Sequence, residues 1–209
     1  MAENDEKFQN IIEGVYSIFI QYGIKNVSMD DLCRELGISK KTLYKFVENK
    51  QDLLLKVNEY IQNLISRRIE ALKNTDLNAI DVLLEMSKVS NENHTKINPM
   101  VNFEIRKYYP QVYATYFNQK KELIIESILY NLEQGIKEGL YRQDLNKEIV
   151  AHLYFKKIEE FHSMEGDELK NFSYSAIFEV MFENHIRGIS NENGIAYFEK
   201  QKEKLNFNI

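Results

Sequence analysis

The 209-residue sequence contains few residues that cross-link or break a chain. Cys33 is the only cysteine, so no disulfide can form within the chain, and a cysteine-based zinc site lacks ligands. Two prolines, Pro99 and Pro110, and eight glycines exclude collagen-like and low-complexity architectures. A hydrophobic fraction of 44% and a charged fraction of 28% are typical of a folded globular protein. The scarcity of chain breakers favours helices.

Long hydrophobic runs are also missing. No apolar stretch approaches the roughly 20 residues that a membrane-spanning helix needs. The first seven residues are acidic and polar, whereas a signal peptide has a basic start followed by an apolar segment. We therefore expect a cytoplasmic protein that does not associate with membranes.

Apolar residues recur at helical spacing along most of the chain. Ile11, Ile12, Val15 and Phe19 form one such stripe and predict a helix over 4–22. Alternating strand patterns are absent, so the sequence predicts an all-α fold with a polar tail that frays from about Lys200. Further helices are predicted over 29–36, from 40 onward, and over 50–73, 77–91, 99–108, 111–138, 147–164 and 169–190.

The second and third predicted helices are separated by a short turn. Ser28 followed by Asp31 is an acidic variant of the capping box and marks the start of one helix. Gly37 ends that helix, and Ser39 is positioned to cap the next. A turn of about three residues between two such helices is typical of a helix-turn-helix.

This part of the chain is also locally basic. The formal net charge of the whole chain is −5, which argues against a protein that is basic throughout. Residues 39–56, in contrast, carry five lysines and only two acidic residues. The basic segment coincides with the third predicted helix and the start of the fourth.

Residues 23–54 resemble the DNA-binding signature of the TetR family of bacterial transcriptional regulators. The resemblance covers a Gly-apolar turn at residue 23, the Gly-Ile-Ser-Lys-x-Thr-Leu-Tyr sequence at 37–44 and Asn-Lys-x-x-Leu at 49–53. It is dense over about 50 N-terminal residues. One position departs from it, since the family most often has an aromatic residue where this chain has Val47.

The resemblance implies an architecture and an activity. Residues 1–50 are expected to form a three-helix helix-turn-helix DNA-binding domain, joined by the helix beginning near residue 50 to a helical ligand-binding and dimerisation domain over 51–209. The expected activity is that of a repressor, without enzymatic activity or cofactor. By this resemblance it is expected to bind a palindromic operator in double-stranded DNA as a homodimer and to be released by a small molecule.

The resemblance and the chemistry of the side chains together give candidate DNA contacts. Lys40, Lys41 and Thr42 can reach base edges in the major groove. Tyr44 and Lys50 are expected on phosphates, Lys50 at a helix N-terminus. Phe46 could contact a thymine methyl or a deoxyribose, or pack inside. The full set is Ser28, Ser39, Lys40, Lys41, Thr42, Tyr44, Lys45, Phe46 and Lys50.

Two further sets lie in the C-terminal part. Aromatic residues that could line a pocket for a flat apolar effector are Phe103, Tyr108, Tyr109, Tyr113, Phe117, Tyr154 and Phe155. The last predicted helix is apolar around much of its circumference, which predicts burial on more than one side and pairing with a second subunit. The residues expected at that interface are Phe178, Met181, Phe182, Ile186 and Ile189.

Two alternatives remain open from the sequence. The chain could be a helical module that uses its basic helix on a protein partner. It could also be a ferritin-like metal bundle, because Glu159 and His162 form one Glu-x-x-His pair, but such sites need a second pair, which the other histidines do not supply. Gly-x-Ser-x-Gly, phosphate-binding glycine loops and His-Glu-x-x-His are absent, which disfavours an enzyme.

Overall fold

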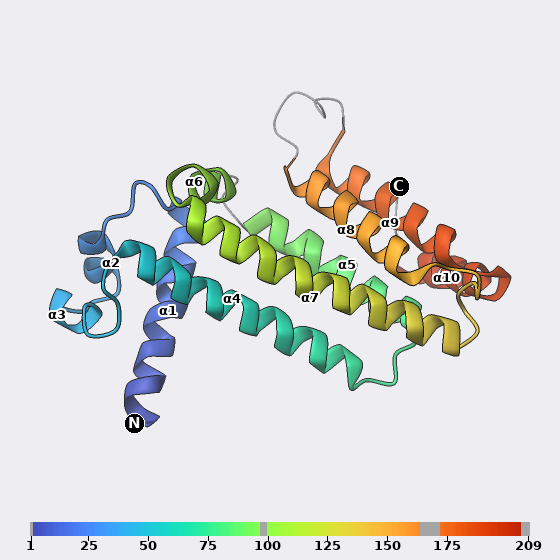
Figure 1. Cartoon of the computed structure of the whole chain (residues 1–209), viewed down its shortest axis with the longest axis horizontal. Coiled ribbons are helices and arrows are strands. Elements are labelled where there is room, and N and C mark those ends of the chain that lie inside the picture. Colours follow the sequence, from blue (N-terminus) through green and yellow to red (C-terminus); the bar gives the residue numbers. More distant parts are fainter. Residues whose placement is uncertain (1, 97–99, 164–171, 206–209) are drawn as a thin grey trace. The chain divides into compact units, whose positions relative to one another are not determined.

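The computed structural model describes residues 2–96, 100–163 and 172–205, and those residues form ten α-helices (Figure 1). The only β-type pairing in them is an isolated bridge between Tyr141 and Ser190. The predicted all-α class is confirmed. The helices are α1 (Ala2–Tyr22), α2 (Met29–Glu35), α3 (Lys40–Leu43), α4 (Lys50–Lys73), α5 (Ala79–Lys96), α6 (Met100–Tyr108), α7 (Pro110–Lys137), α8 (Lys147–Ser163), α9 (Tyr174–Ile189) and α10 (Glu192–Leu205).

Most helix boundaries agree with the expected ones to within a few residues. Pro110 begins α7. Its fixed φ suits the first turn of a helix, and the lack of an N–H costs nothing there because an N–H at that position has no helical acceptor. Pro99, Met164 and residues 169–171, which belong to predicted helices, lie outside the described residues. The segment from Lys200, expected to be a polar tail that frays, is helical as far as Leu205, and residues 206–209 lie outside the described residues.

The chain divides into two compact units. The first comprises Met1–Glu70 and Glu92–Lys120, and the second comprises Ala71–Asn91 and Lys121–Ile209. The boundaries between these units fall within α4, α5 and α7. The functional division expected at residue 50 is a separate matter and stays a prediction.

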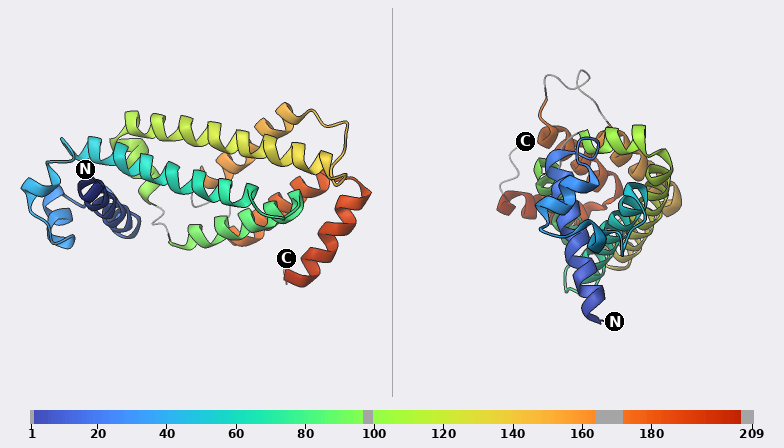
Figure 2. Two further views of the ribbon diagram at one scale, coloured as in Figure 1. Left: turned by 90° about the horizontal axis from the view of Figure 1, so that it is seen from below. Right: turned by 90° about the vertical axis from the view of Figure 1, so that its left-hand side faces the viewer.

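The core of the first unit joins α1 to the three helices that follow it. Its fully buried residues include Val15 of α1, Leu32 of α2, Leu43 of α3 and Leu53 of α4. Figure 2 shows α2 and α3 in blue next to the beginning of α4. Cys33 lies in the same core, where burial raises the pKa of its thiol and makes it unreactive.

In the second unit, α9 packs against α8 and α10. Its core contains Leu132 and Tyr141, and the Tyr141 hydroxyl donates to Asn131 Oδ1 at 3.1 Å. Asn131 Nδ2 in turn donates to the carbonyl oxygen of Ala79 at 2.8 Å. These bonds satisfy polar groups that would otherwise destabilise the apolar interior.

Candidate nucleic-acid interface

A reciprocal cap fixes the start of α2. Ser28 Oγ accepts a hydrogen bond from the Asp31 N–H at 3.1 Å, and Asp31 Oδ2 accepts one from the Ser28 N–H at 3.0 Å. The predicted capping box is therefore present. Hydrogen bonds from Ser28, followed by the neighbouring Arg34, lower the pKa of Asp31 to about 2. The carboxylate that holds the cap is consequently charged at physiological pH.

The turn between α2 and α3 has the predicted geometry. Gly37 has a φ of 63°, a left-handed conformation in which a side chain would be strained. Two residues later, Ser39 Oγ accepts from the Thr42 N–H at 3.0 Å and caps α3. Leu43 and Val47 are buried and attach this segment to α1, α2 and α4. The short α3 therefore has a fixed orientation on the first unit.

One side of α3 faces away from the core and is basic. Lys40, Lys41, Tyr44 and Lys45 are exposed, and the Tyr44 ring is 48% accessible. Lys40 Nζ pairs with Asp30 Oδ1 of α2 at 2.7 Å. Thr42 is half-buried, with its hydroxyl 2.8 Å from Ser39 Oγ. The structure thus brings together Tyr44 and three of the four lysines predicted to contact DNA, Lys40, Lys41 and Lys45.

The two predicted serine contacts serve first as caps. Besides accepting the Asp31 N–H, the Ser28 hydroxyl donates to Asp31 Oδ2 at 2.6 Å. Ser39 Oγ is similarly shared between the Thr42 amide and the Thr42 hydroxyl. Both serines are exposed, but their hydroxyls already make hydrogen bonds at the starts of α2 and α3.

Phe46 packs against the first helix. Its ring stacks on that of Phe8, with centroids 5.1 Å apart and planes at 23°, and it is half-buried at the edge of the core. The neighbouring Val47 is buried where the family signature most often has an aromatic residue. Of the two interpretations open for Phe46, this geometry favours packing.

Lys50 points inward rather than toward the exposed face. Its ammonium donates to the carbonyl oxygens of Ile24 and Val27, in the turn between α1 and α2. Burial lowers the pKa of Lys50, while the nearby carboxylates of Glu104 and Asp31 act in the opposite direction. The geometry therefore departs from the expected phosphate contact, and the amine holds the turn instead.

Comparison with known proteins identifies the type of helix-turn-helix. Residues 11–57 match the family model described as bacterial regulatory proteins, tetR family. The chain is 21% identical over 185 residues to the uncharacterized HTH-type transcriptional regulator YvaF of Bacillus subtilis, covering 87% of this chain and 95% of that protein. The match therefore extends well beyond the helix-turn-helix.

Solved structures agree with the sequence comparisons. A transcriptional regulator from Cytophaga hutchinsonii superposes with a TM-score of 0.72 at 17% identity, over 88% of this chain and 99% of that one. The regulatory protein TetR from Rhodobacter sphaeroides gives a TM-score of 0.65 at 14% identity, over 87% and 95%. The chain belongs to the TetR family. It is a helix-turn-helix transcriptional regulator with a TetR-like fold, from a family of regulators rather than enzymes.

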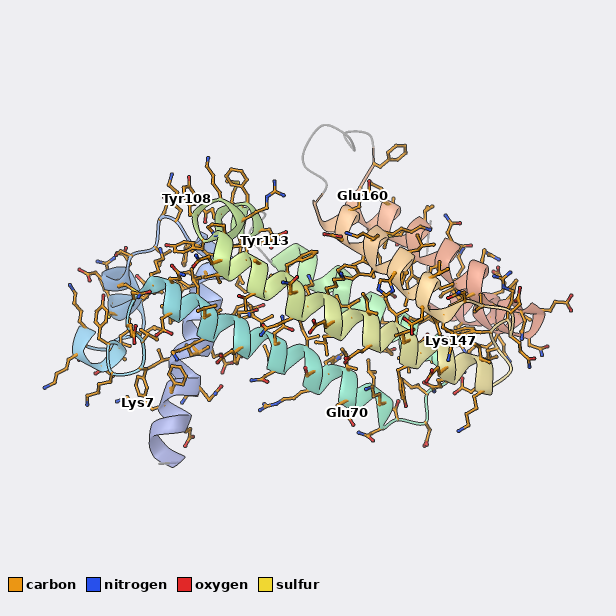
Figure 3. The ribbon with its side chains drawn as sticks, in the orientation of Figure 1. Lys7, Glu70, Tyr108, Tyr113, Lys147 and Glu160 are labelled. Atoms are coloured by element: carbon orange, nitrogen blue, oxygen red, sulfur yellow. The ribbon has the colours of Figure 1, made fainter. Side chains whose placement is uncertain are left out.

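The aromatic residues predicted to line an effector pocket of this TetR-family protein fall into both compact units. Tyr108 on α6 and Tyr113 on α7, labelled in Figure 3, belong to the first unit, together with Phe103, Tyr109 and Phe117. Tyr113 stacks on Phe117 with centroids 6.0 Å apart, and Lys25 Nζ lies 5.2 Å from the Tyr108 ring centre. Their role in effector binding stays a prediction.

The remaining two predicted pocket residues lie in the interior of the second unit. Tyr154 and Phe155 of α8 are both buried. The Tyr154 ring is parallel to that of His185 on α9, with centroids 3.5 Å apart. Burial raises the pKa of Tyr154, so its hydroxyl stays protonated. Core packing accounts for both side chains in the structure.

The predicted dimer residues of α9 are mostly used within the chain. Phe178, Phe182, Ile186 and Ile189 are buried inside the second unit, and Met181 is partly buried. The wide apolar circumference of α9 correctly predicts burial on several sides. Those sides, however, face other helices of the same chain, and not a second subunit. The side chains left exposed are others, including Ile149 and Leu153 of α8 and Val180 of α9.

Glu104 is a buried charged residue that the sequence did not single out. Its carboxylate accepts hydrogen bonds from the backbone N–H groups of Ile24 and Lys25, about 80 residues earlier in the chain. No sequence spacing signals a contact over this separation. The sequence offers one clue to this contact, the glycine at position 23. Its φ of 83° in the structure places it in the turn to which the Glu104 carboxylate binds.

The described residues offer no site for a metal ion or a membrane span. Among them, no three His, Cys, Asp or Glu side chains are grouped to hold a metal. Glu159, one half of the Glu-x-x-His pair, forms an ion pair with Lys156, with Oε2 2.6 Å from Nζ. The side chain of His162 is not among those that the structure describes. No helix in this part of the chain is long and apolar enough to cross a membrane.

Proposed function

We propose that this protein is a ligand-responsive repressor that binds a palindromic operator as a homodimer, with α3 of each subunit in the major groove. The exposed basic side of α3 carries the proposal, because the Ser39 cap and the buried Leu43 and Val47 hold it rigidly while Lys40 and Lys41 stay accessible. Rigid support of this kind is what base reading requires.

The side chains of α3 divide into two roles. Lys40, Lys41 and Thr42 lie in its first turn, where a recognition helix meets base edges. Tyr44 and Lys45 follow at its C-terminal end, suited to phosphates that set the register without reading sequence. Lys50 and Phe46 are assigned to positioning the helix, in line with their inward contacts.

A pair of exposed apolar residues on α8 supports dimerisation. Ile149 and Leu153 are 56% and 59% accessible and lie one turn apart, so they share a helix face. Burying such a face against its symmetric copy removes apolar surface from water. Two α3 helices about 34 Å apart would then meet successive major grooves. An effector bound in the C-terminal part would change that separation through α4 and release the DNA.

Selection of bound fragments from the genomic DNA of the source bacterium tests this function. Purified protein at moderate salt is expected to enrich an inverted repeat. The triple variant Lys40→Ala, Lys41→Ala, Lys45→Ala should bind that repeat on the order of 100-fold more weakly, from the typical value of specific and phosphate contacts. A matched control, Lys7→Ala, Lys137→Ala, Lys200→Ala, removes the same charge from exposed positions elsewhere and should bind as the wild type does.

Two outcomes would overturn the proposal. One is the absence of any enriched sequence, even at salt low enough for non-specific binding to persist. The other is an equal loss of affinity in the two triple variants, which would mean that net charge, and not the α3 surface, determines binding. Capture of a protein partner by the same basic face, with no enriched DNA, would support the protein-binding alternative.

A further inference from the structure

The turn between α1 and α2 is held by a carboxylate from α6. Glu104 is only 7% exposed, and its Oε2 accepts from the N–H of Ile24 at 2.6 Å and from that of Lys25 at 2.9 Å. These two N–H groups lie beyond the end of α1, so Glu104 supplies the acceptor that buried backbone N–H groups require. A charged acceptor on buried amide donors makes a stronger bond than a neutral one.

Gly23 makes this approach possible. A Cβ at this position would lie 2.9 Å from Glu104 Oε2, closer than real Cβ contacts. The φ of 83° would strain any side-chain-bearing residue as well. The turn and the carboxylate thus approach each other closely, and the two hydrogen bonds to Ile24 and Lys25 hold the carboxylate against the turn.

Lys50 holds the same turn through its carbonyl groups. The N–H of Ile24 is bound by Glu104 of α6, and the carbonyl oxygen of Ile24 is bound by the ammonium of Lys50 of α4. Lys50 also bonds the carbonyl oxygen of Val27, the residue just before the Ser28 cap. The two opposite charges lie near enough to influence each other. We call Glu104, Lys50 and residues 23–27 the turn clamp.

We propose that Glu104 is a positioning residue through which α6 holds the helix-turn-helix in the orientation that binds DNA. This inference rests on the proposed function. The turn clamp ends where α2 begins, so the position of α2, and of α3 attached to it, follows the position of α6. Glu104 lies on α6 together with Phe103 and Tyr108. An effector that displaced α6 would therefore move the turn between α1 and α2, and with it the helix-turn-helix.

Two variants separate the hydrogen bonds from the charge. Glu104→Met keeps a long side chain and removes both acceptor oxygens. Glu104→Gln restores one acceptor oxygen, which suffices geometrically because Oε2 alone serves both amides. Glu59→Met removes the same charge from an exposed position of α4 in the same unit and is the matched control.

The experiment measures operator affinity by fluorescence anisotropy, and amide hydrogen exchange in the absence of DNA, at a temperature where every variant is folded. Glu104→Met should bind the operator at least tenfold more weakly, Glu104→Gln should recover part of that loss, and Glu59→Met should match the wild type. Exchange at Ile24 and Lys25 should accelerate in Glu104→Met, while the buried amides of Leu32 and Cys33 stay protected. That combination separates lost positioning from unfolding of the helix-turn-helix.

The result that overturns the inference is a folded Glu104→Met protein with wild-type operator affinity. Accelerated exchange at Leu32 and Cys33 together with weak binding would also overturn it, because the carboxylate would then be needed for folding rather than for orientation. Failure of the proposed function looks different, since the wild type itself would enrich no operator. In that case unchanged exchange at Ile24 and Lys25 in Glu104→Met would also refute the turn clamp.

Discussion

The ammonium of Lys40, expected in the major groove, is paired in the structure with the carboxylate of Asp30 at 2.7 Å. This bond and the charge of Asp30 raise the pKa of Lys40. Both side chains are more than half exposed, and exposed ion pairs contribute little to stability. In the proposed complex DNA would therefore displace Asp30 at little cost, but the carboxylate would remain on the binding face and repel the phosphates.

Replacing Asp30 with Asn should strengthen binding to DNA of any sequence. The change frees Lys40 and removes a negative charge from the binding face, so we expect a gain of about three- to tenfold at low salt that shrinks as screening increases. Anisotropy titrations at two salt concentrations measure it. Asp144→Asn, in an exposed pair with Arg142 in the second unit, is the control and should change nothing. Weaker binding by Asp30→Asn would indicate instead that Asp30 orients Lys40 for base reading.

Sequence reasoning at this scale succeeds where a contact is local. The caps by Ser28 and Ser39 depend on partners three residues away, and their spacing revealed both. Lys50 and Phe46 differ, because their orientation depends on Ile24, Val27 and Phe8, which are more than 20 residues distant. Their residue types suit either an outward or an inward role, and only the tertiary structure distinguishes the two.

At the scale of elements, periodicity predicted nine of the ten helices of the described residues. It missed α10, a segment rich in Lys and Glu with a glycine in its first turn. That helix depends on tertiary contacts, because a Cβ on Gly194 would lie 2.1 Å from the carbonyl oxygen of Leu140, and Phe198 is buried. Asn191, whose Oδ1 accepts from the Gly194 N–H at 3.0 Å, was the one available start signal.

The exposed face of α8 leads to a prediction about assembly. Ile149→Lys combined with Leu153→Lys places two charges on the proposed interface, where they would be buried without partners. We expect the mass in solution, measured by light scattering after size exclusion, to fall from twice 24.8 kDa to 24.8 kDa. Tyr22→Lys with Leu64→Lys changes two exposed apolar residues elsewhere and should leave the dimer intact. A double α8 variant that remains dimeric would place the interface on another surface.

At the scale of the whole molecule, the charges of the protein are separated in a way that net charge hides. A chain with a net charge of −5 presents a lysine-rich helix, and the acidic remainder disfavours non-specific association with DNA. The family could be predicted because its signature is confined to about 50 consecutive residues with strict turn and cap requirements. The helices after it need only be apolar on suitable faces, which many sequences satisfy, so neither the effector site nor the interface could be derived from the pattern alone.

A single buried group, His185, is expected to make the stability of the folded chain sensitive to acid. His185 is 8% exposed and stacked on Tyr154, and burial, followed by the charge of Lys157, lowers its pKa to about 3. In the unfolded chain its pKa is about 6.5, so the unfolded state takes up a proton first as the pH falls. The stabilisation from neutral His185 is therefore complete above pH 6.5 and is lost progressively between pH 6.5 and about 3.

Between pH 7 and pH 5 this linkage should lower the free energy of unfolding by about 2 kcal/mol. His185→Phe keeps a flat ring against Tyr154 and removes the titration, so its urea midpoint, followed by circular dichroism, should change much less over the same interval. His152→Phe removes an exposed histidine and should retain the wild-type pH dependence. Carboxylates contribute little above pH 5, since most titrate below it. Equal pH dependence in His185→Phe and the wild type would show that protonation of His185 does not control this loss of stability.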